Sequence, residues 1–385
     1  MAGADLERLT RNAVDVLPEG GLEQKLALGR PLRVKLGIDV TAPHVTLGNG
    51  IPLQRMAAFQ REGHMGVLIV GDYTTRIGDP SGRSATRPML DPEEIDRNAQ
   101  RYFEHASTII DPDRTEVRFN SEWLSKLDFA EILRLTRTTT VARLLERDDF
   151  AKRYAANAPI SVSELLYPLM QAYDSVAVEA DVELGGTDQL YNLLMGREVM
   201  EAYGLEPQIA VTNELMLSWD ESLMSASRGN YVALVEAPEE QFGKTMRIRD
   251  SLLPQWYRLV LESDEDPLVG DPLEAKLRLA RFVVTRAHGE EAARAAEEHF
   301  TRVVREGRAP EDVPELRLPD GDPVHLPGLL VEGLGIGSTS EARRLIGQGG
   351  VRLDGEPVTE LDVARSRLEG RLLQAGKRRF ARLTT

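Results

Sequence analysis

The stretch LRVKLGIDVTAPHVTLGNGIPLQRMAAFQREGHMGVLIVGD, residues 32–72, decides the fold. A short apolar run at 32–39 ends in an acid, an amphipathic segment of helix length follows at 48–62, and a second β-rich run covers 66–72. Strands that alternate with helices predict βαβ units around a parallel sheet, with ligands at the carboxyl ends of the strands. The alternation returns where a helix expected at 188–203 precedes a strand at 208–212. The sequence therefore predicts a Rossmann-like α/β domain.

The remaining chain divides by composition. We predict a Rossmann-like catalytic and ligand-binding domain at 1–231, a helical domain at 232–313, a breaker-rich linker at 314–322 and a small α+β module at 323–385. Residues 1–17 are expected to form an amphipathic helix, without the basic start and long apolar core of a signal peptide. No apolar run approaches the roughly 20 residues of a membrane span. A cytoplasmic protein that does not contact membranes is the expectation.

Charge and cysteine content exclude several classes of protein. The 385 residues contain no cysteine, which rules out disulfides, thiolate metal sites and a cysteine nucleophile. The net charge of −15 argues against non-specific coating of nucleic acid. Residues 323–385 nevertheless hold ten Lys/Arg against seven Asp/Glu, so the rest of the chain carries −18. This asymmetry indicates a small basic module attached to an acidic body.

Polar residues gather in three places that the predicted topology brings near strand ends. Tyr167, Gln171 and Asp174 fall on one face of a predicted helix that is otherwise apolar, where they need a polar ligand or internal partners. The segment LGGTDQ at 184–189 is expected to be a glycine turn ending in an N-cap pair that opens the next helix. The loop at 71–83, with two acids and three glycines, predicts a shaped binding edge.

These residues belong to longer stretches that resemble a known family across essentially the whole chain. The stretches are GIDVTAP (37–43), GDYTTRIGDPSGRS (71–84), NSEWL (120–124), TVARLLERDDFAKRYA (140–155), LLYPLMQAYDSVAVEADVELGGTDQ (165–189) and SRGNYV (227–232). The sequence resembles bacterial tyrosyl-tRNA synthetases, which are class I aminoacyl-tRNA synthetases, of the branch with a C-terminal S4-like domain. The segment SEARRLIGQGGVRLDGEPV (340–358) is similar to that RNA-binding domain.

The resemblance implies an amino-acid pocket. Tyr167, Gln171 and Asp79 would hold the α-ammonium group, and Asp174 would accept a hydrogen bond from the substrate phenol. Sites that bind a substrate hydroxyl reject the analogue lacking it by about 10⁴–10⁵, a range for which tyrosyl-tRNA synthetases are themselves a measured example. Some members also present a tyrosine on the first strand, where the register here offers Lys35 or Leu36. Residues lining the ribose and aminoacyl side would be Gly37, Asp39, Gly185, Asp188 and Gln189.

The two ATP signatures of the family are altered. The first has two histidines around a Leu-Gly pair, and here Thr46 and Asn49 stand in their places. The second, Lys-Met-Ser-Lys-Ser, becomes Leu223-Met224-Ser225-Ala226-Ser227. The residues that the resemblance assigns to catalysis are Thr41, Thr46, Asn49, Ser225 and Ser227, and those that it assigns to the nucleotide are Gly48 and Met224. ATP with Mg²⁺ would be a co-substrate, with no tightly bound cofactor and no resident metal.

The altered signatures leave three hypotheses open. Loss of one preorganised donor costs roughly 2.7–4 kcal/mol, so four independent losses would exceed about 10 kcal/mol in tyrosine activation, although such losses are seldom additive. The chain could be a tyrosine–tRNA ligase compensated by His44, Arg228, Arg76, Arg83 or Mg²⁺. It could instead be a paralogue that binds tyrosine, an analogue or a charged tRNA in a biosynthetic or regulatory role. A pure RNA-binding protein is disfavoured because the chain keeps all four residues of the implied amino-acid pocket, Tyr167, Gln171, Asp174 and Asp79.

The last expectations concern partners. By resemblance, Arg343, Arg344 and Arg352 lie on a helix–turn–strand that faces RNA, with Lys377, Arg378 and Arg379 in a later hairpin. Positive side chains on one edge of a small domain suit phosphate contacts, so tRNA is the expected partner. The family further implies a homodimer.

Overall fold

The computed structural model describes residues 2–40, 44–77, 79, 91–305, 313–376 and 379–385. Within them the chain forms two compact units, Met1–Ala237 with Lys244–Ala287, and Pro238–Gly243 with His288–Thr385. The first unit contains a six-stranded sheet and the second a five-stranded sheet.

The six-stranded sheet confirms the predicted α/β fold. Its strand order is β1-β6-β5-β2-β3-β4. Five strands run parallel: β2 (Arg33–Ile38), β3 (Met65–Val70), β4 (Thr115–Phe119), β5 (Val182–Gly186) and β6 (Ile209–Asn213). β2 therefore lies beside β5. β3 and β4 extend the sheet on the side of β2, and β6 and β1 extend it on the side of β5. The carboxyl ends at such a switch point are where open α/β sheets bind ligands.

The N-terminal segment differs from its prediction. Residues 1–17 were expected to be one helix, but α1 (Ala2–Leu9) is followed by β1 (Ala13–Leu17), which pairs antiparallel with β6. Asn12 between them has a positive φ of 58°, which ends the helix. The alternation of Val14, Val16 and neighbouring polar residues suits a sheet edge, so pairing with β6 overrides the local helical pattern.

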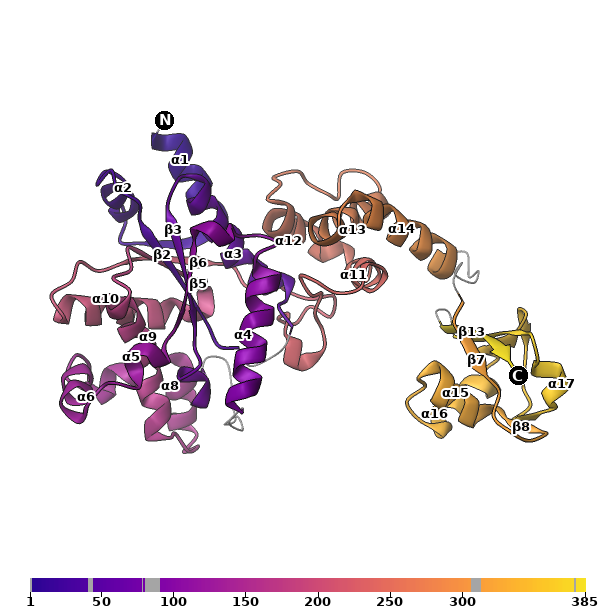
Figure 1. Cartoon of the computed structure of the whole chain (residues 1–385). Coiled ribbons are helices and arrows are strands. Elements are labelled where there is room, and N and C mark those ends of the chain that lie inside the picture. Colours follow the sequence, from indigo (N-terminus) through magenta and orange to yellow (C-terminus); the bar gives the residue numbers. More distant parts are fainter. Residues whose placement is uncertain (1, 41–43, 78, 80–90, 306–312, 377–378) are drawn as a thin grey trace. The chain divides into compact units, whose positions relative to one another are not determined.

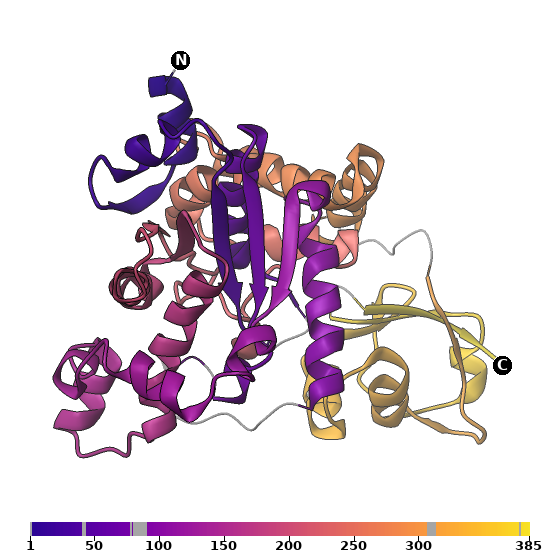
Figure 2. The same ribbon diagram turned by 60° about the vertical axis from the view of Figure 1, so that its left-hand side comes forward.

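Two layers of helices cover the sheet (Figures 1 and 2). The side chains of β3 alternate between the two faces, and their packing shows which helices lie on each face. Leu68 and Val70 pack in one cluster with α3 (Leu47–Arg61). Val67 and Ile69 face the other way, toward residues that follow α9 (Val162–Ala177). On that side α10 (Leu190–Ala202) packs along α9. The predicted helices at 48–62 and 188–203 are therefore confirmed.

The other helices of the first unit are α2 (Gly21–Leu26), α4 (Pro92–Ala106), α5 (Ser121–Leu124), α6 (Phe129–Thr136), α7 (Val141–Leu144), α8 (Asp148–Ala155), α12 (Leu253–Trp256) and α13 (Pro272–His288). In the region predicted to be helical, most described residues lie in helices, and loops cover 232–237 and 262–271. The region also includes α11 (Pro238–Thr245), α14 (Glu290–Phe300) and π-helical turns at Tyr257–Leu261 and Thr301–Arg305.

The second unit contains the predicted α+β module. Its strands are β7 (Glu315–Arg317), β8 (Val324–His325), β9 (Val351–Leu353), β10 (Glu356–Pro357), β11 (Asp362–Val363), β12 (Leu372–Ala375) and β13 (Arg379–Thr384). The helices α15 (Leu326–Leu334), α16 (Thr339–Gly347) and α17 (Arg365–Leu368) join them. β7 lies within the span predicted as a linker and pairs parallel with β13. That span thus contains a strand, and the four-part division otherwise stays a prediction.

Candidate active site

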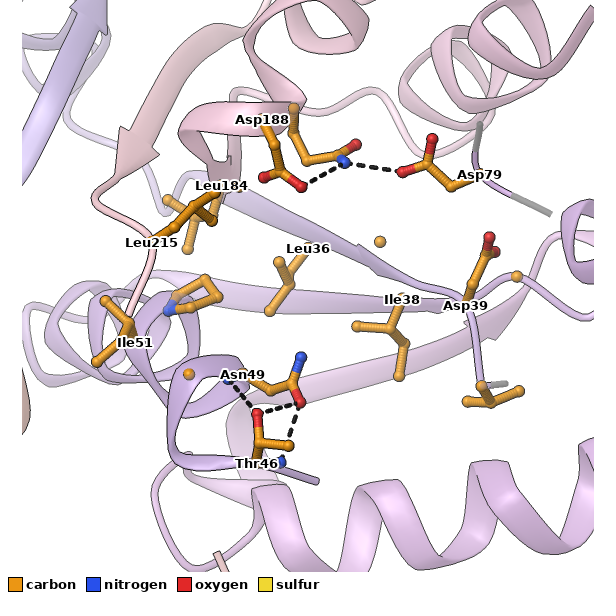
Figure 3. A pocket seen from close by; sticks show the side chains of 18 of the residues that line it. Leu36, Ile38, Asp39, Thr46, Asn49, Ile51, Asp79, Leu184, Asp188 and Leu215 are labelled. Carbon is orange, nitrogen blue, oxygen red and sulfur yellow. Dashed lines mark hydrogen bonds between the residues drawn. The ribbon is translucent and has the colours of Figure 1, made fainter. Parts of the chain in front are cut away.

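A pocket of about 450 Å³ opens at the carboxyl ends of β2 and β5. Its walls come from segments far apart in the chain: the start of α3, the ends of β2 and β5, one face of α9, and the loop at 223–227. Figure 3 shows Thr46 and Asn49 on one side of the pocket and Asp79 and Asp188 on the other. The predicted site residues that line it are Gly37, Asp39, Thr46, Gly48, Asn49, Asp79, Tyr167, Gln171, Asp174, Gly185, Asp188, Gln189, Met224, Ser225 and Ser227.

The two residues that replace the first-signature histidines bond to each other. Thr46 is the N-cap of α3, and its hydroxyl accepts the Asn49 backbone N–H at 3.2 Å. Asn49 Oδ1 accepts the Thr46 backbone N–H at 3.0 Å and the Thr46 hydroxyl at 2.8 Å (Figure 3). This reciprocal capping box uses the helix-start donors and acceptors within the chain. Gly48 lies between them, so the helix start itself reaches the pocket.

The loop at 223–227 is held from outside the pocket by Asn230. The side-chain oxygen Oδ1 of Asn230 accepts the Ser225 backbone N–H at 3.0 Å, and Asn230 Nδ2 donates to the backbone oxygen of Leu223 at 3.1 Å. The Ser225 and Ser227 hydroxyls lie 2.9 Å apart. Leu223 lines the pocket with 44% of its surface exposed. The loop therefore keeps a defined shape without its two lysines.

Positive charge is scarce along the walls of the pocket. None of the lining residues in the described part of the chain is a lysine or an arginine, whereas Asp39, Asp79, Asp174, Asp188 and Glu214 all line it. His44 lines the pocket too, with its ring 5.5 Å from that of Tyr231.

The basic side chains that follow the loop are engaged with other groups. Lys244 donates to Glu236. Arg249 pairs with Glu221 at 3.0 Å, and the Arg247 guanidinium lies 4.1 Å from the centroid of the Trp219 ring. Arg228 is exposed and is not among the lining residues. The side chains of Arg76 and Arg83 lie outside the described part.

The amino-acid end is built around Asp174. Its Oδ1 accepts Trp123 Nε1–H at 2.8 Å, and its Oδ2 accepts Asn120 Nδ2–H at 3.3 Å. Burial raises the pKa of Asp174 to about 7, and the nearby Lys35 ammonium and these two hydrogen bonds oppose that rise. A buried carboxylate with two fixed donors is oriented, and it keeps lone pairs for a further donor. This arrangement can bind a hydroxyl.

Tyr167 and Asp39 join α9 to the end of β2. The Tyr167 hydroxyl donates to Asp39 Oδ2 at 2.9 Å, and Thr74 Oγ1 donates to Asp39 Oδ1 at 2.9 Å. Burial and the facing carboxylates of Asp39 and Asp79 raise the pKa of Tyr167 well above its ordinary value. The phenol therefore stays protonated. Because its O–H donates a hydrogen bond to Asp39, the phenol oxygen can accept a hydrogen bond from a ligand.

The third polar cluster connects α10 to the 71–83 loop. Gln189 Nε2 donates to Asp79 Oδ2 at 2.8 Å (Figure 3). Arg147, which is 6% exposed, approaches Asp79 Oδ1 at 3.5 Å and donates to Asn192 Oδ1 at 3.1 Å. Burial and the neighbouring Asp79 charge raise the pKa of Asp188. Gln189 and Arg147 thus orient the Asp79 carboxylate, which lines the pocket.

The double glycine is required by close approach, although its local structure differs from the prediction. Gly185 and Gly186 end β5, and 187–189 form a 3₁₀ turn without a side-chain cap, so the expected N-cap pair is wrong. A Cβ on Gly186 would lie 2.6 Å from Asp188 Oδ1 and 2.6 Å from Leu215 Cδ2. The Asp188 carboxylate folds back over the strand end and occupies the space that a side chain would need.

Sequence reasoning missed Asn120, Trp123 and Arg147 as parts of the site. All three occur in stretches that carry the family resemblance, and Asn120 directly follows β4. A polar residue at the carboxyl end of a parallel strand is the signal that could have identified Asn120. Thr41 lies outside the described residues.

The sequence matches the family of class I tRNA synthetases (W and Y) over residues 27–305 and the S4 domain over residues 330–362. It is 48% identical to the tyrosine–tRNA ligase of Moorella thermoacetica, over 99% of this chain and 95% of that protein. It is 45% identical to that of Thermotoga maritima, over 98% and 96% respectively. The chain belongs to the tyrosyl-tRNA synthetase family.

A solved member of the tyrosyl-tRNA synthetase family confirms the fold. The Archaeoglobus fulgidus enzyme, solved in complex with L-tyrosine, superposes with a TM-score of 0.60 at 20% identity, over 77% of this chain and 99% of that one. The S4 match at residues 330–362 falls within the α+β module of the second unit.

In the S4 domain of this family member, the predicted RNA-binding arginines are exposed. Arg343 and Arg344 lie on α16, and Arg352 lies on β9. Arg379 begins β13 after the turn from β12, whereas Lys377 and Arg378 lie outside the described residues. Within the described ranges no group of three potential metal ligands gathers, and no helix there is long and apolar enough to cross a membrane.

Proposed function

We propose that the chain is a tyrosine–tRNA ligase: the tyrosine carboxylate attacks the α-phosphate of ATP to form tyrosyl-adenylate with release of pyrophosphate, and the tyrosyl group then passes to tRNA(Tyr) with release of AMP. The observation that carries this proposal is the buried Asp174 carboxylate, which lines the pocket between two fixed donors, Trp123 and Asn120. We assign Asp174 the role of accepting the substrate phenol O–H. A desolvated acceptor that only a hydroxyl can satisfy favours tyrosine over phenylalanine.

The ammonium group of the substrate would be held by Tyr167, Gln171 and Asp79. The Tyr167 hydroxyl donates its hydrogen bond to Asp39, so the lone pairs of its oxygen are left for the ligand. Gln171 Oε1 accepts from Asn192 at 3.1 Å while its Nε2 faces Glu183, which orients the amide. An ammonium has three donors and no acceptor, so a set of oriented oxygens is what it requires.

The nucleotide would occupy the end of the pocket formed by the α3 start and the 223–227 loop. Gly48 allows close approach to the helix N-terminus, which attracts negative charge. Asp39, Gly185, Asp188 and Gln189 would face the ribose and the aminoacyl group. ATP would arrive with Mg²⁺ as substrate, and its dication is the principal positive charge that we expect beside the phosphates.

We further propose that the activation step of this chain is weak. The charge that develops on the leaving pyrophosphate is stabilised by preorganised cations, each worth about 10²–10³ in rate. In the described part of the lining, His44 is the single side chain that can carry positive charge. Thr46 and the Oδ1 atom of Asn49 bond to each other, and neither side chain carries a positive charge.

Exchange of labelled pyrophosphate into ATP in the presence of tyrosine tests the activation step, and charging of tRNA(Tyr) tests the transfer step. Tyrosine-dependent exchange with charging would support the ligase. Tyrosine binding by calorimetry without any exchange would instead favour a paralogue that uses the amino-acid pocket for another purpose. Absence of tyrosine binding would refute both the ligase and the pocket assignment.

Two further proposals concern partners. The exposed Arg343, Arg344 and Arg352 would contact tRNA phosphates, a role that would place the protein in the cytoplasm. The chain would form a homodimer through the successive helices α6 to α9, whose exposed apolar side chains include Phe129 (74%), Val141 (63%), Tyr154 (66%) and Val162 (74%). Analytical ultracentrifugation of the native chain and of Val162→Glu tests the dimer, which the charged variant should dissociate.

A further inference from the structure

A buried ion pair lies directly behind the amino-acid pocket. Lys35 of β2 is 0% exposed and Glu183 of β5 is 1% exposed, and the Lys35 Nζ lies 2.8 Å from Glu183 Oε1. Val34 and Leu36, on either side of Lys35, pack in the core cluster that includes α3. Lys35 therefore points to the opposite face of the sheet, toward α9. Neither partner of the pair lines the pocket in the described part of the chain.

The lysine is fixed to α9 at two points that bracket Asp174. Its Nζ donates to the backbone oxygen of Gln171 at 3.0 Å and to Ser175 Oγ at 2.7 Å. Ser175 is the next residue after Asp174 and Gln171 is one turn before it. The three donors of the ammonium are thus used on Glu183, Gln171 and Ser175, and the charge is held close behind the Asp174 carboxylate.

Glu183 gathers the same residues from the other side. Its carboxylate accepts Ser175 Oγ–H at 2.8 Å, Gln208 Nε2–H at 2.9 Å and Gln171 Nε2–H at 3.3 Å, besides the lysine. An unpaired charge at this depth would be strongly unfavourable, so the pair persists as a unit. Through Gln171, the unit also orients a side chain that lines the pocket.

Several elements around Asp174 contribute charged or titratable groups that affect its ionisation. Lys35 (β2) favours its ionised form, as do the hydrogen bonds from Asn120 and Trp123, while burial and Glu183 (β5) oppose ionisation. Tyr167, on the same helix, is coupled electrostatically to Asp174 and to the facing carboxylates of Asp39 and Asp79. Lys35 is the one cation that is identified as acting on Asp174 among the described residues.

We propose that Lys35 is a positioning residue for recognition of the substrate hydroxyl: its buried ammonium, bonded to α9 on both sides of Asp174, favours the ionised carboxylate, which accepts a hydrogen bond from a phenol instead of donating one. This inference rests on the proposed function, because it assumes that Asp174 binds the phenol. It adds a determinant of specificity that does not touch the substrate. The chemical class that it selects is an amino acid with a hydrogen-bond donor at the end of an aromatic side chain.

The ionised form is required for binding, so the sign of the pH effect follows. The pKa of Asp174 is about 7. Tyrosine affinity should be full above this value and fall by about tenfold for each pH unit below it, since the protonated acid no longer serves as a charged acceptor. Loss of the lysine charge should move this midpoint to higher pH. Phenylalanine, which has no hydroxyl, should show no such dependence.

The experiment measures calorimetric dissociation constants of L-tyrosine and L-phenylalanine between pH 5.5 and 8.5 for the native chain and for Lys35→Met. We expect the tyrosine midpoint of Lys35→Met to lie about one pH unit or more above the native one. Its tyrosine affinity at pH 7 should fall several-fold while that for phenylalanine is unchanged. The double variant Lys35→Met/Glu183→Gln leaves no unpaired buried charge, so it protects the test from misfolding, and its midpoint should lie between those of the other two proteins.

Lys25→Met is the matched control. Lys25 is also buried, at 3% exposure, and is ion-paired with Asp181 at 3.4 Å, but it is not among the groups that act on Asp174. It should lower thermal stability and leave the tyrosine midpoint unchanged. The inference would be overturned if Lys35→Met and the double variant fold and keep the native midpoint. If Asp174→Asn leaves the preference for tyrosine intact, the proposed role of Asp174 in binding the phenol fails instead, whatever Lys35 does.

Discussion

Thr46 and Asn49 satisfy each other across the first turn of α3, with Asn49 Oδ1 accepting both the backbone N–H and the hydroxyl of Thr46. Where the family signature places two imidazoles, this chain has a closed hydrogen-bonded pair. The helix start is therefore stabilised by the substitution, typically by about 1 kcal/mol for a good cap. The same pair contributes no cation to the pocket.

Restoring the missing cations should increase activation. We expect Leu223→Lys/Ala226→Lys to raise the rate of tyrosine-dependent pyrophosphate exchange by roughly 10² or more, because each preorganised charge stabilises the leaving group. The loop is held by Asn230 in any case, so the added side chains start from an ordered backbone. Leu223→Gln/Ala226→Gln, of similar length without charge, should leave the rate near the native value. Equal rates in both variants would contradict the electrostatic explanation.

Replacing the phenol acceptor should abolish discrimination. Asp174→Asn keeps the shape of the side chain but removes the charge and places an amide N–H₂ in the site. We expect the ratio of tyrosine to phenylalanine affinity to fall on the order of 10²-fold or more, since the site then loses a charged acceptor for the hydroxyl. Trp123→Phe removes one orienting donor at 2.8 Å and should produce a smaller loss of the same kind. Competition binding with both amino acids measures the ratio.

The double glycine should not tolerate a methyl group. In Gly186→Ala the new Cβ would meet Asp188 Oδ1 and Leu215 Cδ2, both at 2.6 Å, so the Asp188 carboxylate must move. We expect a loss of about 1–3 kcal/mol of unfolding free energy from overpacking, together with weaker tyrosine binding. Gly243→Ala is the control for an unobstructed Cβ, because nothing lies within 4 Å of it, and since Gly243 lies in α11 this variant should gain up to about 1 kcal/mol of stability. Denaturant titration of the two variants compares them, and equal stability would show that the glycine is dispensable.

The arginines of the S4 domain should act through charge. Arg343→Gln/Arg344→Gln should weaken tRNA binding and reduce the slope of log affinity against log salt by up to about two, one for each lost phosphate contact. Arg371→Gln is the control, because that guanidinium already pairs with Asp354 at 2.7 Å. Filter binding at several salt concentrations gives the slopes. An unchanged slope in the double variant would place RNA contact elsewhere.

The strand–helix alternation could be predicted because it depends on short-range hydrophobic patterns, and the family resemblance indicated many of the residues that line the pocket, although not Asn120. The strand at 13–17 could not be predicted, because its pairing partner lies at 209–213 and its local pattern resembles a helix. The mutual bonding of Thr46 and Asn49, the folding of Asp188 over Gly186 and the contact between Trp123 and Asp174 depend on side-chain direction. Residue type and spacing alone do not determine that direction.

The sheet order β1-β6-β5-β2-β3-β4 has a consequence for how this protein can change. One mouth of the pocket rests on the start of α3 and the 223–227 loop, and its floor rests on α9 with Lys35 and Glu183 beneath it. No residue is shared between these two supports. Mutations can therefore accumulate around the proposed nucleotide end without distorting the amino-acid end, so the two binding functions of the pocket can change separately.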